Sequence, residues 1–186
     1  MIQIDFAAVQ AGTKSLAEQT KGLTLTDLQT STKELFDALQ SLITGASDQA
    51  MVFVPHDPAA TAGDEKGWSI GHVVAHLTSS VEEICALTAH QARGVELDGQ
   101  FRLRYETPWE NIKTVEQVKA RLTESRRMAL AFLDAWPDVP NLQREITFVP
   151  VFGPLNAIGL CALGIFHGQL HRQQIEETLS QYAQQA

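Results

Sequence analysis

Two histidines near the C-terminus, His167 and His171, are four residues apart in a segment that has the periodicity of a long helix. On a helix, residues i and i+4 lie one turn apart on the same face. The ring nitrogens of two such imidazoles converge on a point beside the helix, where both can bind one metal ion. The alternative is a pair of solvated or core histidines, because a motif of this size is a weak signal.

A second pair with the same spacing, His72 and His76, lies in the segment that begins at Ser69. Ser69 is a good N-cap, and apolar residues follow it at helical spacing to about His90. By this spacing His76 lies close to the apolar face of the helix, and His72 lies one turn nearer to its start. For each histidine alone, the alternative is a hydrogen-bonded residue in the core or at its boundary.

Four amphipathic helices are expected to position these histidines. They are predicted to begin at Thr24 or Thr26, at Ser69, at Thr114 and after residue 156, and the first three to end near Gly45, His90 and Trp136. The chain has no tandem repeat and no low-complexity segment. We therefore predict an all-α fold, a four-helix bundle with long connections over residues 24–186, preceded by an N-terminal extension over residues 1–23.

Facing helices of a bundle build metal sites from side chains that point inward. In such a site, His167 and His171 supply two ligands and the second helix supplies the third. Three protein ligands leave a coordination position for water or substrate, and this is typical of catalytic rather than structural metal sites.

The connections are long. Residues 46–66 exceed what a tight helical hairpin needs, and we expect a functional or a covering segment there. In the connection over residues 91–113, Arg102, Arg104 and Tyr105 could line an opening, although a solvated loop is the favoured interpretation.

Two further segments have less regular patterns. The apolar, β-branched run over residues 146–152 has no obvious partner strand, so we expect an extended loop packed on the bundle. Residues 1–22 are compatible with a short helix packed on the main body and equally with a loosely held tail.

Composition excludes several classes of protein. The chain has 186 residues, of which 44% are hydrophobic, and this suits one globular domain. A net charge of −8 without a basic patch argues against nucleic-acid binding. An apolar run long enough to span a bilayer is absent, and so is a secretory signal, so we expect a cytoplasmic protein. Cys85 and Cys161 are then most simply reduced, buried and inert.

Two segments resemble the DinB-like (DinB/YfiT) superfamily of metal-dependent enzymes. Trp68–Leu77 (WSIGHVVAHL) is similar to its second-helix signature, and Phe166–Gln174 (FHGQLHRQQ) to its final-helix signature. The two motifs stand in the family's order, and the resemblance covers roughly residues 24–183. It implies a four-helix bundle in which His76, His167 and His171 bind a divalent metal, commonly nickel or zinc. His72 stands where the family often has an acidic or polar residue, so its role is open.

The resemblance also bears on function. Family members often form homodimers, and the better-understood ones use low-molecular-weight thiols as co-substrates. It therefore implies a thiol-dependent transferase that acts on a small molecule. The alternatives are a metal-dependent hydrolase and a non-catalytic metal-binding or stress-associated protein. Glu83, seven residues after His76, is a candidate general base, but a surface glutamate is the favoured interpretation. The chain does not identify the substrate.

Overall fold

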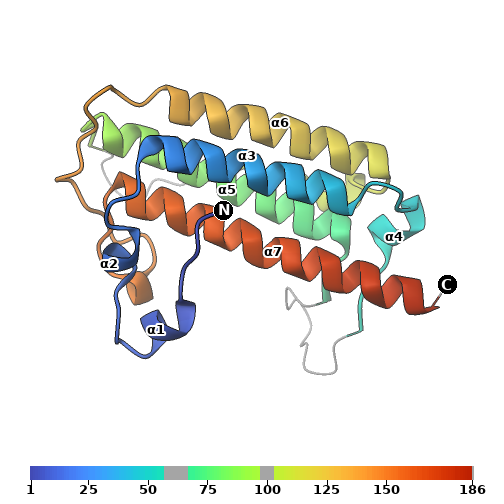
Figure 1. Ribbon diagram of the computed structural model, residues 1–186. Coiled ribbons are helices and arrows are strands. Elements are labelled where there is room, and N and C mark those ends of the chain that lie inside the picture. The colour runs from blue at the N-terminus through green and yellow to red at the C-terminus, as the bar shows by residue number, and fades with distance from the viewer. Residues whose placement is uncertain (57–66, 97–102, 186) are drawn as a thin grey trace.

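The computed structural model describes residues 1–56, 67–96 and 103–185. Four long helices form a bundle (Figure 1): α3 (Leu25–Leu42), α5 (Ile70–Ala92), α6 (Val115–Asp134) and α7 (Ala157–Gln185). Shorter elements are the helices α1 (Phe6–Gln10), α2 (Leu16–Thr20) and α4 (Asp48–Val52), and the 3₁₀ turns Trp109–Asn111 and Pro150–Phe152. The predicted all-α four-helix bundle is confirmed. Among the described residues, no helix has the length and apolar character needed to span a membrane.

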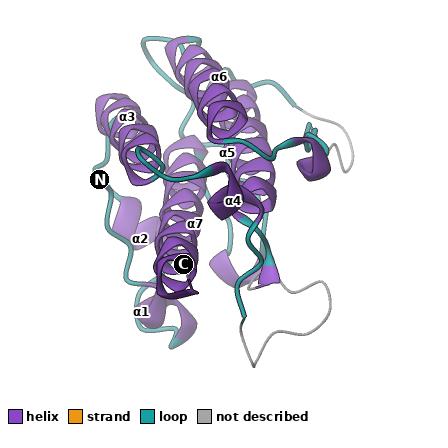
Figure 2. Cartoon of the chain, turned by 90° about the vertical axis from the view of Figure 1, so that its right-hand side faces the viewer, coloured by secondary structure: helices purple, strands orange, loops and turns teal. Residues whose placement is uncertain are grey.

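The four long helices occupy the corners of a square when the bundle is viewed near its end (Figure 2). α5 packs against α6 and α7, and α3 packs against the other sides of α6 and α7. α3 and α7 run in one direction, and α5 and α6 run in the opposite direction (Figure 1). Because α5 and α6 are parallel neighbours, the chain between them must return along the length of the bundle, and this explains the long connection that follows α5.

Local capping explains where the helices begin. The hydroxyls of Thr24 and Thr114 each accept a hydrogen bond from the backbone N–H three residues later. The side chains of those later residues, Asp27 and Gln117, accept in turn from the backbone N–H of the capping residue. Ser69 caps α5 through its hydroxyl. The three predicted helix starts are therefore confirmed, with Thr24 rather than Thr26 opening the first helix.

Close helix packing surrounds the histidine segment of α7. A Cβ atom added to Gly168 would lie 2.6 Å from a methyl group of Leu35 on α3. One added to Gly164 would lie 2.8 Å from a methyl group of Ile84 on α5. A side chain at either glycine would have to displace these methyl groups, so α7 lies at close range to both α3 and α5. The histidines of α7 therefore sit on a firmly packed element.

The N-terminal segment packs on the bundle, so the loosely held tail is the wrong alternative. Leu16 of α2 is fully buried, and Ile2 is 7% exposed. The backbone carbonyl of Ile2 accepts a hydrogen bond of 2.9 Å from the side-chain amide of Gln169 on α7. The division of the chain at residue 23 stays a prediction.

The apolar run after α6 is an extended loop, as predicted. Ile146 and Leu155 form an isolated antiparallel bridge, with both backbone hydrogen bonds at 2.9 Å. Phe148 and Phe152 from this loop pack against buried residues of α5 and α7. The loop therefore covers the outer side of the α5–α7 pair. Of the other predicted connection, residues 46–66, the first part contains α4, and residues 57–66 lie outside the described chain.

Candidate metal centre

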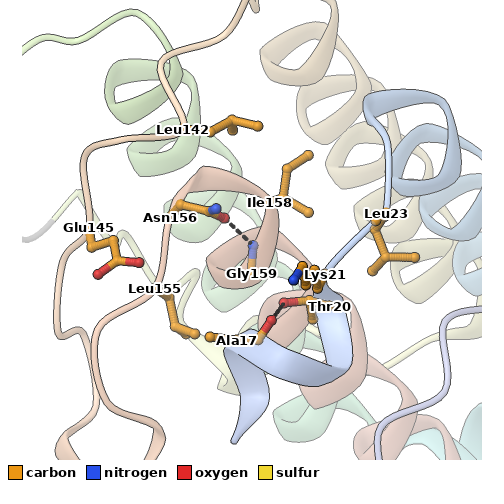
Figure 3. A pocket seen from close by; sticks show the side chains of 11 residues that line it. Ala17, Thr20, Lys21, Leu23, Leu142, Glu145, Leu155, Asn156, Ile158 and Gly159 are labelled. Carbon is orange, nitrogen blue, oxygen red and sulfur yellow. Dashed lines mark hydrogen bonds between the residues drawn. The ribbon is translucent and has the colours of Figure 1, made fainter.

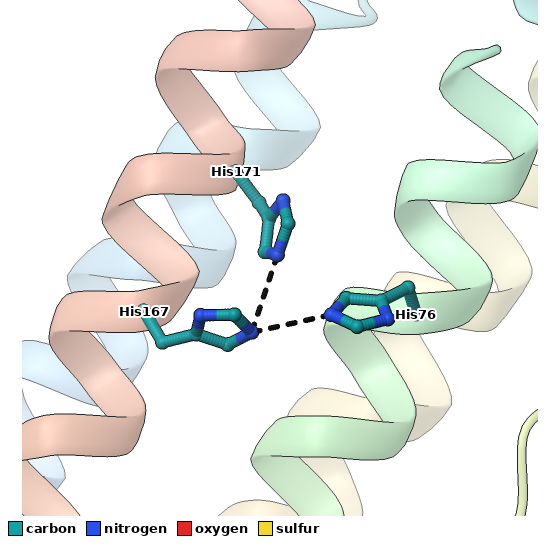
Figure 4. A group of neighbouring side chains, drawn as sticks. All are labelled: His76, His167 and His171. Atoms are coloured by element: carbon teal, nitrogen blue, oxygen red, sulfur yellow. Dashed lines mark hydrogen bonds between the residues drawn. The ribbon is translucent and has the colours of Figure 1, made fainter. Parts of the chain in front are cut away.

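Three histidine side chains converge between α5 and α7 (Figure 4). The Nε2 atom of His167 lies 3.3 Å from Nε2 of His76 and 3.2 Å from Nε2 of His171. One ring nitrogen of each histidine lies within 4.8 Å of those of the other two. The structure thus brings together the three residues that we predicted as ligands, while metal binding by them stays a prediction.

The spacing of these nitrogen atoms can be compared with that of a metal site. In tetrahedral zinc sites the metal–nitrogen distance is about 2.0–2.1 Å, so two ligand nitrogens lie about 3.3–3.4 Å apart. The two Nε2 separations of 3.2 and 3.3 Å are close to this edge length. These two pairs of nitrogens in the histidine trio are therefore spaced like ligands of one ion of this size.

Hydrogen bonds on the outer ring nitrogens determine where the protons lie. The side-chain amide oxygen Oε1 of Gln174 lies 2.9 Å from Nδ1 of His171. That oxygen can only accept, so Nδ1 of His171 donates and its Nε2 presents a lone pair to the trio. The guanidinium of Arg104 lies 2.6 Å from Nδ1 of His76. A guanidinium can only donate, so this Nδ1 accepts and the proton of His76 is on Nε2.

These assignments leave Nε2 of His167 in conflict. It faces the N–H of His76 on one side and the lone pair of His171 on the other. A ring nitrogen carries either a proton or a lone pair, so it can satisfy only one of the two neighbours. A cation at the centre would bind three lone pairs and remove the conflict at His167, provided that the guanidinium of Arg104 turns from Nδ1 of His76 toward its other partner, Glu106. The proton of His76 would then be on Nδ1, 3.9 Å from the Glu106 carboxylate.

The protonation equilibria of His76 and His167 also favour metal binding. Burial is the main reason that the pKa of His76 falls from its ordinary 6.5 to about 3, and the neighbouring His171 and Arg104 lower it further. Burial lowers the pKa of His167 to about 4, again with a contribution from His171. Both imidazoles are therefore neutral at pH 7, and the neutral form is the one that binds a metal.

Arg104 belongs to this site, so the solvated-loop interpretation is wrong for that residue. Besides its contact with His76, its guanidinium pairs with the carboxylate of Glu106. Tyr105, between them in sequence, is 76% exposed. Arg102, the third residue predicted to line an opening, lies outside the described residues. The segment after residue 103 thus supplies one cation and one carboxylate to the outer side of His76.

Glu83 is buried, and its interpretation as a surface residue is wrong. It is 3% exposed, and one of its carboxylate oxygens accepts hydrogen bonds from the backbone N–H groups of Leu103 and Arg104, at 3.1 and 3.2 Å. These bonds anchor the loop to α5 and thereby hold Arg104 beside His76. Glu83 also lines the cavity described below, so its role as a general base stays a prediction.

His72 lies outside the trio. Its ring is stacked between two indoles, at centroid distances of 4.0 Å from Trp68 and 4.7 Å from Trp109. Burial lowers its pKa, while the charges of nearby glutamates raise it. Trp68 also contacts the ring of His76, at 5.0 Å. His72 therefore helps to pack the start of α5 against the Trp109 turn, and Trp68 contacts both His72 and His76.

A cavity of about 270 Å³ opens beside the trio. His76, His167, Glu83 and Arg104 lie among its lining residues, and most of the remaining lining is aromatic or aliphatic. A small molecule in this cavity would therefore contact two of the three histidines on one side and an apolar wall on the others.

A second cavity, of about 320 Å³, lies at the start of α7 (Figure 3). Its polar groups complete local structure: Asn156 accepts from the backbone N–H of Gly159, and Thr20 donates to the carbonyl of Leu16. This cavity therefore lies between α2 and the start of α7, and none of the three histidines lines it.

The two cysteines are neighbours in the core. Cys85 and Cys161 are 2% and 1% exposed, and both are free thiols. A hydrogen bond with Cys85, followed by burial, raises the pKa of Cys161. This keeps the thiol protonated, which agrees with the predicted inert role.

The sequence profile of the DinB superfamily matches residues 31–175. This match spans more than half of the chain and includes all three histidines of the trio. Comparisons with curated proteins and with solved structures gave no match. The resemblance predicted from the two helix motifs is thereby confirmed, and the chain belongs to the DinB superfamily.

Proposed function

We propose that this protein is a metal-dependent enzyme in which His76, His167 and His171 hold a divalent nickel or zinc ion. The observation that carries the proposal is the conflict at Nε2 of His167, which hydrogen bonding among the three rings leaves unresolved and a shared cation would remove. The cavity beside His76 and His167 gives a small molecule access to the same point.

The chain's own residues would orient the ligands. Gln174 accepts from Nδ1 of His171 and directs its Nε2 toward the trio. Arg104 and Glu106 border Nδ1 of His76, where the carboxylate is the group able to accept a hydrogen bond. The bound ion would act as a Lewis acid, which lowers the pKa of a coordinated water to about 7 or holds a thiol as its thiolate. The apolar wall of the cavity would exclude bulk water.

The reaction we propose is transfer to or from a low-molecular-weight thiol, with a small molecule as the second substrate. The support for a thiol is the family resemblance. A homodimer and a cytoplasmic location are proposed on the resemblance and on the sequence, respectively. The remaining alternative is a non-catalytic metal-binding or stress-associated protein, which holds the ion without turnover; we call this the holding role.

Hydrolysis is a second candidate, favoured by the position of Glu83. Its carboxylate lines the cavity beside His76, where a base could take a proton from a water nucleophile. A hydrolase that uses this base should lose about 100-fold or more of its turnover in Glu83→Gln. A thiol transferase should keep most of its turnover. Because Glu83 also anchors the loop, metal content and melting temperature serve as controls.

The test begins with elemental analysis of protein purified without a histidine tag. We expect close to one divalent transition-metal ion per chain, and turnover of a thiol with an electrophilic partner that stops when a chelator removes the ion. Conversion that is unchanged without thiol would favour the hydrolase. Metal without conversion across thiol and ester panels would favour the holding role. Failure of the protein to bind nickel or zinc would reject all three.

A further inference from the structure

The cavity beside the trio has two chemically different ends. At one end lie the imidazoles of His76 and His167, with Arg104 and Glu83. The rest of the wall is mainly apolar, and its side chains include Phe6, Phe148, Phe152, Phe166, Ile84 and Leu163. A ligand that matches both ends has a polar atom at the histidines and an apolar body in the remainder.

The aromatic wall is assembled from segments that are far apart in sequence. Phe6 comes from α1, Phe152 from the loop before α7, and Phe166 from α7 itself. The ring of Phe6 lies 5.9 Å from that of Phe152 and 6.1 Å from that of Phe166, in tilted arrangements typical of aromatic packing. Phe6 thus joins the other two rings into one apolar surface of the cavity.

The long helices α5 and α7 contribute aliphatic side chains to the same cavity. Ile84 of α5 and Leu163 of α7 are each 6% exposed and line the cavity. At Gly164 the two helices approach so closely that a Cβ atom would lie 2.8 Å from a methyl group of Ile84. α5 and α7 are thus in direct contact along this wall.

Volume and polarity limit what can enter. A cavity of about 150 Å³ lined by aliphatic and aromatic side chains accepts benzene, so about 270 Å³ accommodates one aryl ring with a short polar head. A charged group would lose its hydration against the phenylalanine rings without gaining a partner there. Among the described residues that line the cavity, the guanidinium is that of Arg104, which is already paired with Glu106.

We infer that the substrate of this enzyme carries an uncharged apolar body the size of one aryl ring, which the phenylalanine wall binds while its polar head meets the trio. This inference rests on the proposed metal-dependent function. Phe6 lies outside residues 31–175, the part that matches the superfamily. The N-terminal segment thus contributes to substrate selection by closing the outer side of the cavity.

Two hydroxamic acids that differ only in their bodies test the inference on the metal-loaded protein. Benzohydroxamic acid should bind about 10- to 100-fold more tightly than acetohydroxamic acid, as measured by calorimetry. Leu163→Phe, which fills the cavity, should reduce this ratio to about threefold or less. Phe6→Ala should lower it by about 3- to 10-fold. In both variants the metal content and the affinity for acetohydroxamic acid should stay unchanged.

Phe53→Ala is the matched control, because Phe53 is also half-buried and packs edge-on against one aromatic partner, Tyr182, at 5.5 Å. It should leave the ratio as in the wild type. Equal affinities of the two hydroxamic acids for wild-type protein would overturn the inference and leave the metal site standing.

A metal-independent probe separates the two proposals. Toluene binding, followed by ligand-observed NMR on chelator-treated protein, should be detected with the wild type and lost in Leu163→Phe. If the protein binds toluene but neither a metal ion nor a hydroxamic acid, the metal-dependent function fails while the apolar cavity stands. Absence of toluene binding to the wild type would overturn the inference.

Discussion

The Nε2 atoms of His76 and His167 lie 3.3 Å apart, although 91 positions separate the two residues in the chain. Both residues are on long helices, α5 and α7, which approach closely at Gly164 a single turn away from His167. Helix packing rather than a loop therefore sets the distance between the two rings. A site held in this way is preorganised for its ligand.

Substitution of the two histidines of α5 should separate their roles. His76→Ala should lower metal affinity by more than about 100-fold, because it removes a ligand. His72→Ala should lower it by less than about tenfold, because His72 is stacked between Trp68 and Trp109. Competition titration with a chromogenic chelator measures both values. Equal and severe losses would instead indicate a four-histidine site.

Glu106→Gln should weaken metal binding by about 10- to 100-fold, the range for groups that accept a hydrogen bond from a metal ligand. The reason is that metal binding at Nε2 of His76 puts its proton on Nδ1, 3.9 Å from this carboxylate. The matched control is Glu110→Gln, which removes the same charge from an exposed residue nearby. Similar effects of the two substitutions would show that charge alone matters.

The features that sequence analysis predicted correctly depend on short-range patterns. Thr24, Ser69 and Thr114 cap helices through contacts with residues three positions later. The pair His167 and His171 lies on one face because of helical geometry alone. Amphipathic spacing then predicted four helices. In the bundle that they form, α5 packs against α7, and this places His76 beside His167 and His171.

The features that it missed depend on contacts across the fold. Arg104 reaches His76 because Glu83 holds the backbone of the loop, and neither contact follows from sequence spacing. Glu83 has the helical phase of a boundary residue, and the loop that buries it begins about twenty positions later. The stacking of His72 requires Trp109 from a separate turn. Long connections are the parts of a bundle that periodicity leaves undetermined.

Acid should destabilise the metal-free protein through the trio. The folded-state pKa is about 3 for His76 and about 4 for His167, below the value of 6.5 expected in the unfolded chain. The unfolded chain therefore binds more protons as pH falls. Above about pH 6.5 the two histidines therefore do not lower the free energy of unfolding. Below that pH the free energy of unfolding falls progressively, until the pH has passed through the two folded-state pKa values.

Urea midpoints of chelator-treated protein between pH 7.5 and pH 4 measure this effect. His76→Gln should make the decline shallower, because one of the two groups no longer titrates. His56→Gln, at an exposed position, should follow the wild type. A decline equally steep in His76→Gln and in the wild type would show that other groups cause it.

Gly71→Ala should destabilise the bundle and displace the Trp109 turn. A Cβ atom at Gly71 would lie 2.2 Å from the backbone carbonyl oxygen of Ile112, which cannot move without shifting the chain. We expect a loss of about 1–3 kcal/mol in the free energy of unfolding. Gly67→Ala is the control, because no atom lies within 4 Å of a Cβ there. Equal stability of the two variants in urea would contradict this close packing.

X-ray absorption spectroscopy of the tag-free protein loaded with one equivalent of zinc tests the central claim most directly. The spectrum should show three imidazole nitrogens at about 2.0–2.1 Å with one further light atom, and the imidazole signal should weaken in His171→Ala. A shell of oxygen ligands without imidazole, or sulfur at about 2.3 Å, would contradict the assignment of His76, His167 and His171 as the metal ligands.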